Sequence, residues 1–131
     1  MRTFVDPDAP EVCLLDDDAS VLRSMQYLLA SDGIPVRAFN KPDDFLAYAA
    51  VHRVPVVVTD IWMPGITGLE ILARTCALKP RPRVIIITAR DDLAARATAM
   101  AVGPVAFFIK PFNDEQFLAA VHDALAQADQ S

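Results

Sequence analysis

The residues of this sequence best suited to chemistry each follow a run of apolar residues. Asp16 and Asp17 follow VCLL, Asp60 ends VVVTD, Thr88 ends VIIIT, and Lys110 follows FFI. Aspartate is a poor strand former and is seldom buried without a partner. A carboxylate at the end of a β-branched run therefore either caps the next turn or takes part in chemistry.

If the fold gathers these side chains, the carboxylates will repel one another. Each pair at about 4 Å costs roughly 4 kcal/mol at an effective dielectric constant near 20. Lys110 supplies one positive charge. Oxygen-only ligands in a partly hydrated cleft favour Mg²⁺, which completes its coordination with waters and phosphate oxygens. The set therefore predicts a cleft for a magnesium ion and a phosphoryl group.

The elements that would position these residues alternate along the chain. Five apolar runs alternate with five helical patterns, which indicates an α/β fold with a parallel sheet. The expected strands are 12–15, 34–39, 54–59, 84–88 and 105–109. The second contains Pro35 and Arg37, so it belongs at an edge, whereas the others are nearly continuously apolar. We expect a doubly wound five-stranded sheet of order 2-1-3-4-5, as in flavodoxin-like (βα)5 folds.

The helical patterns each give one buried face and recognisable starts. Thr67 with Glu70 forms a capping-box pattern, Pro42 suits a first helical position, and Asn113 and Asp18 suit N-caps. Apolar spacing predicts the following buried positions: Val21, Leu22, Met25, Leu28 and Leu29; Phe45, Leu46 and Ala49; Leu69, Leu72 and Cys76; Leu93, Ala97 and Met100; Phe117, Leu118, Val121 and Leu125.

The predicted strand order decides which polar residues meet. The carboxyl ends of parallel strands share one edge of the sheet, and ligands bind there at the point where the strand order reverses. With the first strand beside the third, Asp16 and Asp17 are expected next to Asp60. Thr88 and Lys110 follow the fourth and fifth strands at the same edge.

Composition limits the other functions. A chain of 131 residues suits one domain, and a net charge of −5 argues against direct nucleic-acid binding. No apolar run approaches the roughly 18 residues of a membrane span, and the start MRTFVDPDAP lacks a signal-peptide core, so we expect a cytoplasmic protein without membrane contact. Cys13 and Cys76 are expected as reduced core residues, and His52 and His122 as solvated side chains without partners.

Four motifs together resemble a known family. DDD at 16–18, TDIWMPGITG around Asp60, ITA ending at Ala89 and FFIKPF at 107–112 resemble the receiver domain of two-component response regulators. The resemblance covers residues 11–127, leaving 1–10 as an N-terminal extension and 128–131 as a tail. It implies a chemotaxis-regulator-like fold. TDIWMPGITGLEIL and AVHDALAQ more faintly resemble receivers of nitrogen-fixation-type transcriptional regulators.

The resemblance implies a phosphoacceptor signalling domain rather than an enzyme that turns over a separate substrate. Asp60 would take a phosphoryl group from a sensor histidine kinase. Asp16, Asp17, one oxygen of Asp60 and the main-chain carbonyl of Trp62 would hold Mg²⁺.

Other matching positions would respond to the phosphoryl group. Lys110 would pair with its oxygens, Thr88 would close on it through the hydroxyl, and Phe107 would reorient as Thr88 moves. The Lys110–Pro111 bond is expected to be cis, which costs an X–Pro bond only about 1 kcal/mol. The output would be an effector domain, or a homodimer through the fourth helix, fifth strand and fifth helix.

Some positions depart from the usual family pattern. Phe107 lacks the phenolic hydroxyl of the common tyrosine, and Pro104 stands where a small residue such as alanine is usual. Trp62 and Arg90, two residues beyond Asp60 and Thr88, are expected to flank the mouth of the cleft. There they would tune the rate at which water removes the phosphoryl group.

The residues also allow other functions. Asp16-Asp17-Asp18-Ala19-Ser20 fits the DxDx(T/S) pattern of haloacid-dehalogenase-like phosphatases, with Asp16 as nucleophile and Asp18 as general acid. That interpretation gives Asp60 no role. In such phosphatases an acidic pair follows the lysine, whereas here Asp91-Asp92 precede Lys110. A receiver-shaped interaction module that is never phosphorylated is a further alternative. A flavin carrier is disfavoured because no phosphate loop follows the first strand.

Overall fold

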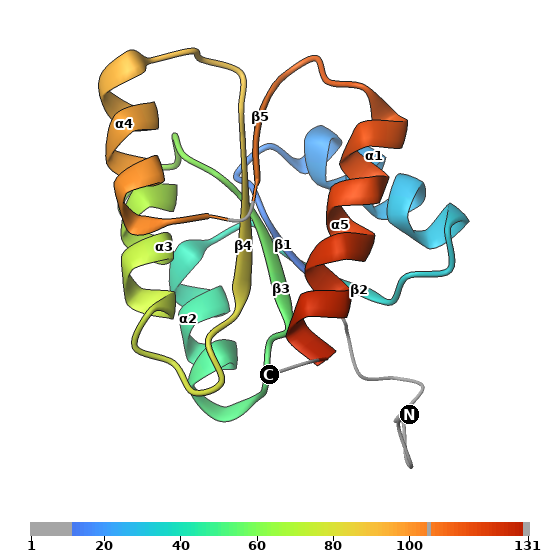
Figure 1. Ribbon diagram of the computed structural model, residues 1–131, viewed down its shortest axis with the longest axis horizontal. Coiled ribbons are helices and arrows are strands. Elements are labelled where there is room, and N and C mark those ends of the chain that lie inside the picture. Colours follow the sequence, from blue (N-terminus) through green and yellow to red (C-terminus); the bar gives the residue numbers. More distant parts are fainter. Residues whose placement is uncertain (1–11, 105, 130–131) are drawn as a thin grey trace.

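The computed structural model describes residues 12–104 and 106–129, which form a parallel sheet between two helical layers (Figure 1). The strands are β1 (Val12–Leu15), β2 (Val36–Phe39), β3 (Val56–Asp60), β4 (Arg83–Thr88) and β5 (Ala106–Ile109), in the order β2-β1-β3-β4-β5. The helices are α1 (Ala19–Ser31), α2 (Pro42–Val51), α3 (Gly68–Thr75), α4 (Leu93–Val102) and α5 (Asp114–Asp129). The predicted fold class and strand order are confirmed. The expected extension 1–10, Val105 and residues 130–131 lie outside the described residues.

The two faces of the sheet are buried by different helices. Helices α1 and α5 cover one face, and α2, α3 and α4 cover the other (Figure 1). Along β1, side chains alternate between the two cores, so that Cys13 and Leu15 pack with α2–α4 while Val12 and Leu14 pack with α1 and α5. Burial on both faces is why the central strands read as continuous apolar runs.

Two strands begin later than the sequence predicts, and proline is the physical reason. Pro35 and Pro55 precede β2 and β3; their carbonyls accept hydrogen bonds from Val12 N–H (3.2 Å) and Arg83 N–H (2.9 Å). Neither proline has an N–H to donate to the ladder in return. Strand β2 pairs with β1 alone among the described strands, which confirms its position at an edge.

The predicted helix starts are present. The Asp18 carboxylate accepts from Ser20 N–H at 2.9 Å, and the Thr67 hydroxyl accepts from Glu70 N–H at 3.3 Å. Asn113 caps α5 by accepting from Gln116 N–H at 2.9 Å. These side chains satisfy amide groups that the first helical turn leaves without partners.

Replacing the cap of α5 tests its contribution to stability. Asn113→Ala removes the acceptor of Gln116 N–H and is expected to lower the free energy of unfolding by about 1 kcal/mol in urea denaturation. Asn113→Asp, which caps equally well, is the control and is expected to keep the stability within a few tenths of a kcal/mol. Equal losses in both variants would contradict the capping role.

Helix α4 buries a different face from the one predicted. Leu93, Ala97 and Met100 were expected inside, but Leu93 is 79% exposed and Met100 55% exposed, and Ala97 is exposed as well. Ala95 and Ala99 pack into the core instead. The prediction was wrong because alanines lie on both sides of this helix, so the apolar spacing fits more than one face.

The two cysteines differ in environment. Cys13 is buried, as expected, and burial raises the pKa of its thiol to about 12, so it remains protonated and unreactive. Cys76 was expected in the core but is exposed. Helix α3 ends at Thr75, and it is Thr75 that is buried at this turn, its hydroxyl donating to Leu72 C=O at 2.8 Å.

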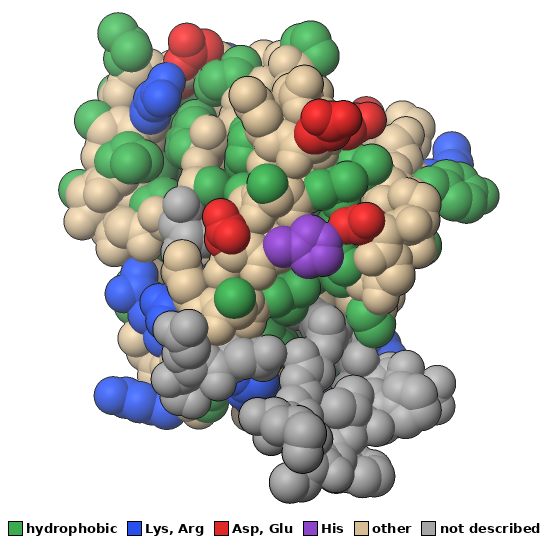
Figure 2. All heavy atoms as spheres, turned by 45° about the vertical axis from the view of Figure 1, so that its right-hand side comes forward, with side chains coloured by type: hydrophobic (Ala, Val, Ile, Leu, Met, Phe, Trp, Pro, Cys, Tyr) green, Lys and Arg blue, Asp and Glu red, His purple; other side chains and the backbone are tan. Residues whose placement is uncertain are grey.

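Both histidines are exposed, as expected, but each also has a neighbour that the sequence did not indicate. His122 Nε2 on α5 contacts the Asp32 carboxylate just after α1, joining the two helices of one layer. Figure 2, turned toward this side, shows a histidine beside an acidic side chain on the surface. The His52 ring stacks on Tyr48 with centroids 4.2 Å apart. Asp32 is distant from His122 in the sequence, so no local pattern indicated this contact.

No helix of the described chain is both long and apolar enough to cross a membrane.

Candidate functional site

The strand register brings the predicted residues to one edge. Leu15 pairs with Thr59, Asp60 with Ile87, and Thr88 with Ile109, so the strand ends that precede Asp16 and Lys110 lie level with those that carry Asp60 and Thr88. The loops that follow these strands gather at the upper end of the molecule in Figure 1. The predicted juxtaposition is confirmed.

Three carboxylates form the centre of this edge. Asp16, Asp17 and Asp60 each offer an oxygen, and these oxygens all lie within 4.8 Å of one another. Asp16 and Asp60 are buried, whereas Asp17 is exposed. Carboxylate oxygens at this spacing, open to water on one side, suit a hard divalent cation. The cluster could therefore hold a metal ion.

Lys110 provides the positive charge that the carboxylates require. Its Nζ lies 3.1 Å from Asp16 Oδ2 and 4.0 Å from Asp60 Oδ2. The Lys110–Pro111 bond is cis, as expected, and a second cis bond that the sequence did not indicate joins Lys79 to Pro80. The ammonium group offsets part of the repulsion between the two buried acids.

The environment of Asp60 makes its carboxylate a stronger base. Burial is the main cause that raises its pKa above the ordinary value, and the nearby Asp16 raises it further. Lys110 lowers the pKa but does not cancel these two effects. The main-chain N–H of Trp62 donates to Asp60 Oδ1, but only at 3.5 Å. Asp60 is thus a buried acid whose charge the surrounding groups stabilise incompletely.

This raised pKa has a consequence for stability. Between the ordinary aspartate pKa of about 3.9 and the raised value, the folded protein binds more protons than the unfolded chain, so the free energy of unfolding falls as pH rises. Asp60→Asn removes that cost. In EDTA at pH 7 it is expected to raise the free energy of unfolding. The gain should shrink as the pH is lowered toward 4.

Urea denaturation between pH 4 and 8 measures this dependence. Asp123→Asn, on the exposed surface of α5, is the matched control for loss of one negative charge. A stability gain for Asp60→Asn that is equal to the control, or that does not change with pH, would contradict the electrostatic account.

Thr88 is fully buried at the end of β4, and its hydroxyl is engaged locally. It donates to Arg90 C=O at 3.3 Å and accepts from Arg90 N–H at 3.2 Å. The Thr88 carbonyl accepts from Lys110 N–H at 2.7 Å, which ties the ends of β4 and β5 together. The hydroxyl therefore has partners on its own loop rather than on a carboxylate.

The site has the arrangement of the family that the sequence resembles. It combines a buried acid at a strand end with an adjacent acidic pair, a lysine and a threonine. The model of the response regulator receiver domain matches residues 12–122. The chain belongs to this family. Receiver domains of response regulators act in two-component signalling, and the comparisons with individual proteins agree with that assignment.

Curated relatives of this receiver include two proteins named transcriptional regulatory protein FixJ. The one from Bradyrhizobium diazoefficiens is 34% identical over 118 residues, covering 90% of this chain and 58% of that protein. The one from Azorhizobium caulinodans is 34% identical over 122 residues, covering 93% and 58%. The receiver therefore spans little more than half the length of these relatives. The expected likeness to this group of transcriptional regulators is confirmed.

Solved structures of receiver domains support the same family assignment. A structure named FixJ-N has 33% identity and a TM-score of 0.82, covering 90% of this chain and 94% of that one. A response regulator receiver protein from Burkholderia phymatum has 39% identity and a TM-score of 0.79, covering 90% and 96%. The signal receiver domain of an HD domain-containing protein from Pseudomonas fluorescens Pf-5 has 26% identity and a TM-score of 0.86, covering 93% and 98%.

Trp62 and Phe107, which the sequence singled out, each have an arginine guanidinium over the ring, as Tyr48 has that of Arg37. The Arg90 guanidinium carbon lies 4.5 Å from the centroid of the Trp62 ring, which is partly buried against the core. The Arg96 guanidinium carbon lies 5.3 Å from the centroid of Phe107. Trp62 and Arg90 were expected to flank the mouth of the cleft, but their spacing in the sequence gave no sign that they stack on each other.

Gly68 is a residue of the receiver site that sequence reasoning missed. It begins α3, and its N–H donates to Ile61 C=O at 2.9 Å. A Cβ atom here would lie 2.2 Å from the main-chain oxygen of Asp60, so the helix can approach the end of β3 only because the residue is glycine. Glycine just after the expected N-cap Thr67, where it weakens a helix, was the available signal.

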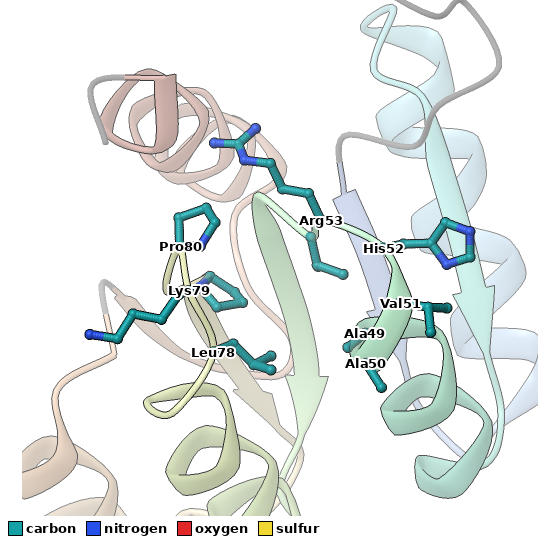
Figure 3. A pocket seen from close by; sticks show the side chains of 10 residues that line it. Ala49, Ala50, Val51, His52, Arg53, Leu78, Lys79 and Pro80 are labelled. Atoms are coloured by element: carbon teal, nitrogen blue, oxygen red, sulfur yellow. The ribbon is translucent and has the colours of Figure 1, made fainter.

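A second recess of the receiver lies at the opposite end of the sheet. It measures about 290 Å³ and is formed by the end of α2, including Ala49, and by the loops before β3 and β4, including Leu78 and Pro80. In Figure 3 the Arg53 side chain extends toward α5, where its Nη2 donates to Ala128 C=O at 3.1 Å. His52 points away from the recess (Figure 3). None of the described residues that line it carries a carboxylate, hydroxyl or thiol, so the acidic edge remains the candidate site.

Proposed function

We propose that this receiver accepts a phosphoryl group on Asp60 from a sensor histidine kinase, with Mg²⁺ as cofactor, in the cytoplasm. The observation that carries the proposal is the position of the Asp60 carboxylate. It is buried at the end of β3, 4.0 Å from the Lys110 ammonium and within 4.8 Å of oxygens of Asp16 and Asp17.

The reaction is a nucleophilic displacement at phosphorus. An oxygen of the Asp60 carboxylate forms the new O–P bond while the bond from phosphorus to the imidazole nitrogen of the donor breaks, and the nitrogen keeps the electron pair. The raised pKa of Asp60 makes its carboxylate a better nucleophile than an ordinary aspartate. The rigid end of a central strand holds this oxygen in place for the attack.

The donor set fits the cofactor. Asp16, Asp17 and Asp60 provide only oxygen ligands, and the exposed Asp17 leaves room for water and phosphoryl oxygens. The Trp62 carbonyl would complete the protein ligands. When bound, Mg²⁺ neutralises charge on the phosphoryl oxygens. Lys110 would pair with those oxygens.

Phosphorylation would then change the surface of the domain. It adds about −1.5 to −2 charges and three acceptor oxygens beside Asp60. Lys110 and the Thr88 hydroxyl move toward these oxygens, and Phe107 follows by packing alone, because it has no hydroxyl. The shift of α4, β5 and α5 is a change of population between two conformations.

The output acts through the surface of α4, β5 and α5. Leu93 is 79% exposed and Met100 55% exposed on α4, leaving apolar area for a second copy of the chain or an effector domain. By analogy with the FixJ relatives, the output is control of transcription. Light scattering of the phosphorylated protein is expected to show dimers, and a monomer at all concentrations would exclude the homodimer.

Phosphodonor uptake separates the receiver from the phosphatase. With acetyl phosphate and Mg²⁺, the unmodified protein is expected to shift on a phosphate-affinity gel, and Asp60→Asn is expected to reduce that shift to background. Asp16→Asn should weaken the uptake without moving the label from Asp60. If Asp16→Asn abolished labelling and Asp60→Asn kept it, Asp16 would be the nucleophile and the proposal would fail.

The structure weighs against the phosphatase in one further respect. That mechanism needs a protonated Asp18, but hydrogen bonds from the Ser20 hydroxyl and from the Val21 and Ser20 N–H groups lower the Asp18 pKa. Its carboxylate already caps α1. An ionised N-cap is a poor general acid.

A further inference from the structure

We propose that Arg90 is a positioning residue that holds this receiver in its unphosphorylated conformation by stacking on Trp62. The inference rests on the proposed phosphorylation of Asp60 and concerns the cost of reaching the phosphorylated state. In the resting domain, the main chain of Arg90 retains the Thr88 hydroxyl, and the stack retains Arg90. Both contacts have to open before Thr88 can reach a phosphoryl group.

We call these two contacts, Thr88 with the Arg90 main chain and Arg90 with the Trp62 ring, the latch. Its first part is the double contact between Thr88 and Arg90. The Thr88 hydroxyl donates to Arg90 C=O at 3.3 Å and accepts from Arg90 N–H at 3.2 Å. The bond that the hydroxyl donates is longer than the usual O–H···O length of about 2.7–2.8 Å, and the bond that it accepts is at the long end of the N–H···O range of about 2.7–3.2 Å, so both bonds are weak. A further contact is needed to keep the Arg90 main chain in this position.

The stack supplies that contact. The Arg90 guanidinium lies over the Trp62 ring at 4.5 Å. The main-chain N–H of Trp62 donates to Asp60 Oδ1 at 3.5 Å. Arg90 therefore joins the residue expected to move, Thr88, to the loop that follows the phosphoacceptor. When the hydroxyl turns toward a phosphoryl group, it leaves both main-chain partners. The loop after β4 is then free to shift, and the guanidinium moves off the ring.

The size of the effect follows from the exposure of Arg90. Cation–π contacts at exposed sites favour the stacked state by about two- to fivefold in the equilibrium constant. The planar guanidinium also stacks on the indole ring, which the ammonium of lysine cannot do. Arg90→Lys should therefore keep part of the latch through charge alone, and Arg90→Ala should lose all of it.

Trp62 is the only tryptophan of the chain, so its fluorescence reports on the stack. We would titrate the protein with beryllofluoride in Mg²⁺ and record both Trp62 emission and its quenching by acrylamide. Arg90→Ala is expected to bind beryllofluoride about two- to fivefold more tightly than the unmodified protein, and to show greater acrylamide quenching before addition. Arg90→Lys should fall between the two. Arg23→Ala, an exposed arginine on α1 in the other helical layer, should match the unmodified protein.

The outcomes separate this inference from the function on which it rests. If the unmodified protein takes up the phosphoryl group on Asp60 and Arg90→Ala has an unchanged half-saturating concentration, the latch is overturned and the phosphoacceptor function stands. A weaker affinity in Arg90→Ala would also overturn it. If the unmodified protein takes up no phosphoryl group on Asp60, both proposals fall.

Discussion

Gly68→Ala is expected to lower the free energy of unfolding by about 3 kcal/mol, at the upper end of the range for overpacked positions. The added Cβ would lie 2.2 Å from the Asp60 main-chain oxygen and 2.9 Å from Ile61 Cα. Both atoms belong to the backbone at the end of β3 and cannot rotate away. Either α3 or the Asp60 main chain must move, so phosphoryl uptake should fall together with the stability.

The control for this variant is Gly65, in the loop that precedes α3. Gly65 has a φ of +85° and no atom within 4 Å of an added Cβ, so Gly65→Ala measures backbone strain without a collision. It is expected to cost about 1–2 kcal/mol. Urea denaturation of both variants gives the comparison. A Gly68→Ala loss no larger than that of Gly65→Ala would show that α3 does not approach β3 this closely.

Lys110→Met is expected to have the largest combined effect on stability and phosphoryl uptake. It removes the ammonium that lies 3.1 Å from Asp16 and 4.0 Å from Asp60, leaving two buried carboxylates without a counter-charge. Breaking a buried pair in this way costs about 3 kcal/mol. Loss of an electrostatic contact to the transferred group typically slows the reaction about 10²–10³-fold.

Mg²⁺ provides an internal check on the Lys110 variant. In EDTA the loss of stability should be complete, whereas added Mg²⁺ should restore more stability to Lys110→Met than to the unmodified protein, because it replaces the missing charge. Lys110→Arg keeps the charge and should lose less in both assays. Uptake from acetyl phosphate within a factor of about three of the unmodified rate would contradict the assigned role of Lys110.

The fold and the centre of the site could be predicted because they depend on rules that sequence patterns express directly. Apolar runs alternating with helical stripes require a parallel sheet, and its strand ends must share one edge. Asp16 and Lys110 are 94 positions apart, yet that rule places both at the same edge, where the structure shows them in contact at 3.1 Å. The caps Thr67 and Asn113 were predictable for the same reason, since each acts within one turn of its own helix.

The parts that could not be predicted depend on packing between elements. The apolar spacing of α4 allowed two faces, and only the fit of Ala95 and Ala99 against the core selects one of them. The contact of His122 with Asp32 joins α5 to the end of α1 through a distance that no local pattern encodes. Likewise, the stack of Arg90 on Trp62 depends on the paths of two loops.

The most direct test of the central claim is chemical identification of the phosphorylated residue. Reduction of the labelled protein with borohydride converts an aspartyl phosphate to homoserine, which peptide mass spectrometry locates in the sequence. After treatment with acetyl phosphate and Mg²⁺, homoserine is expected at position 60 and at no other aspartate. Homoserine at position 16, or a fully labelled protein with an unmodified Asp60, would contradict the assignment.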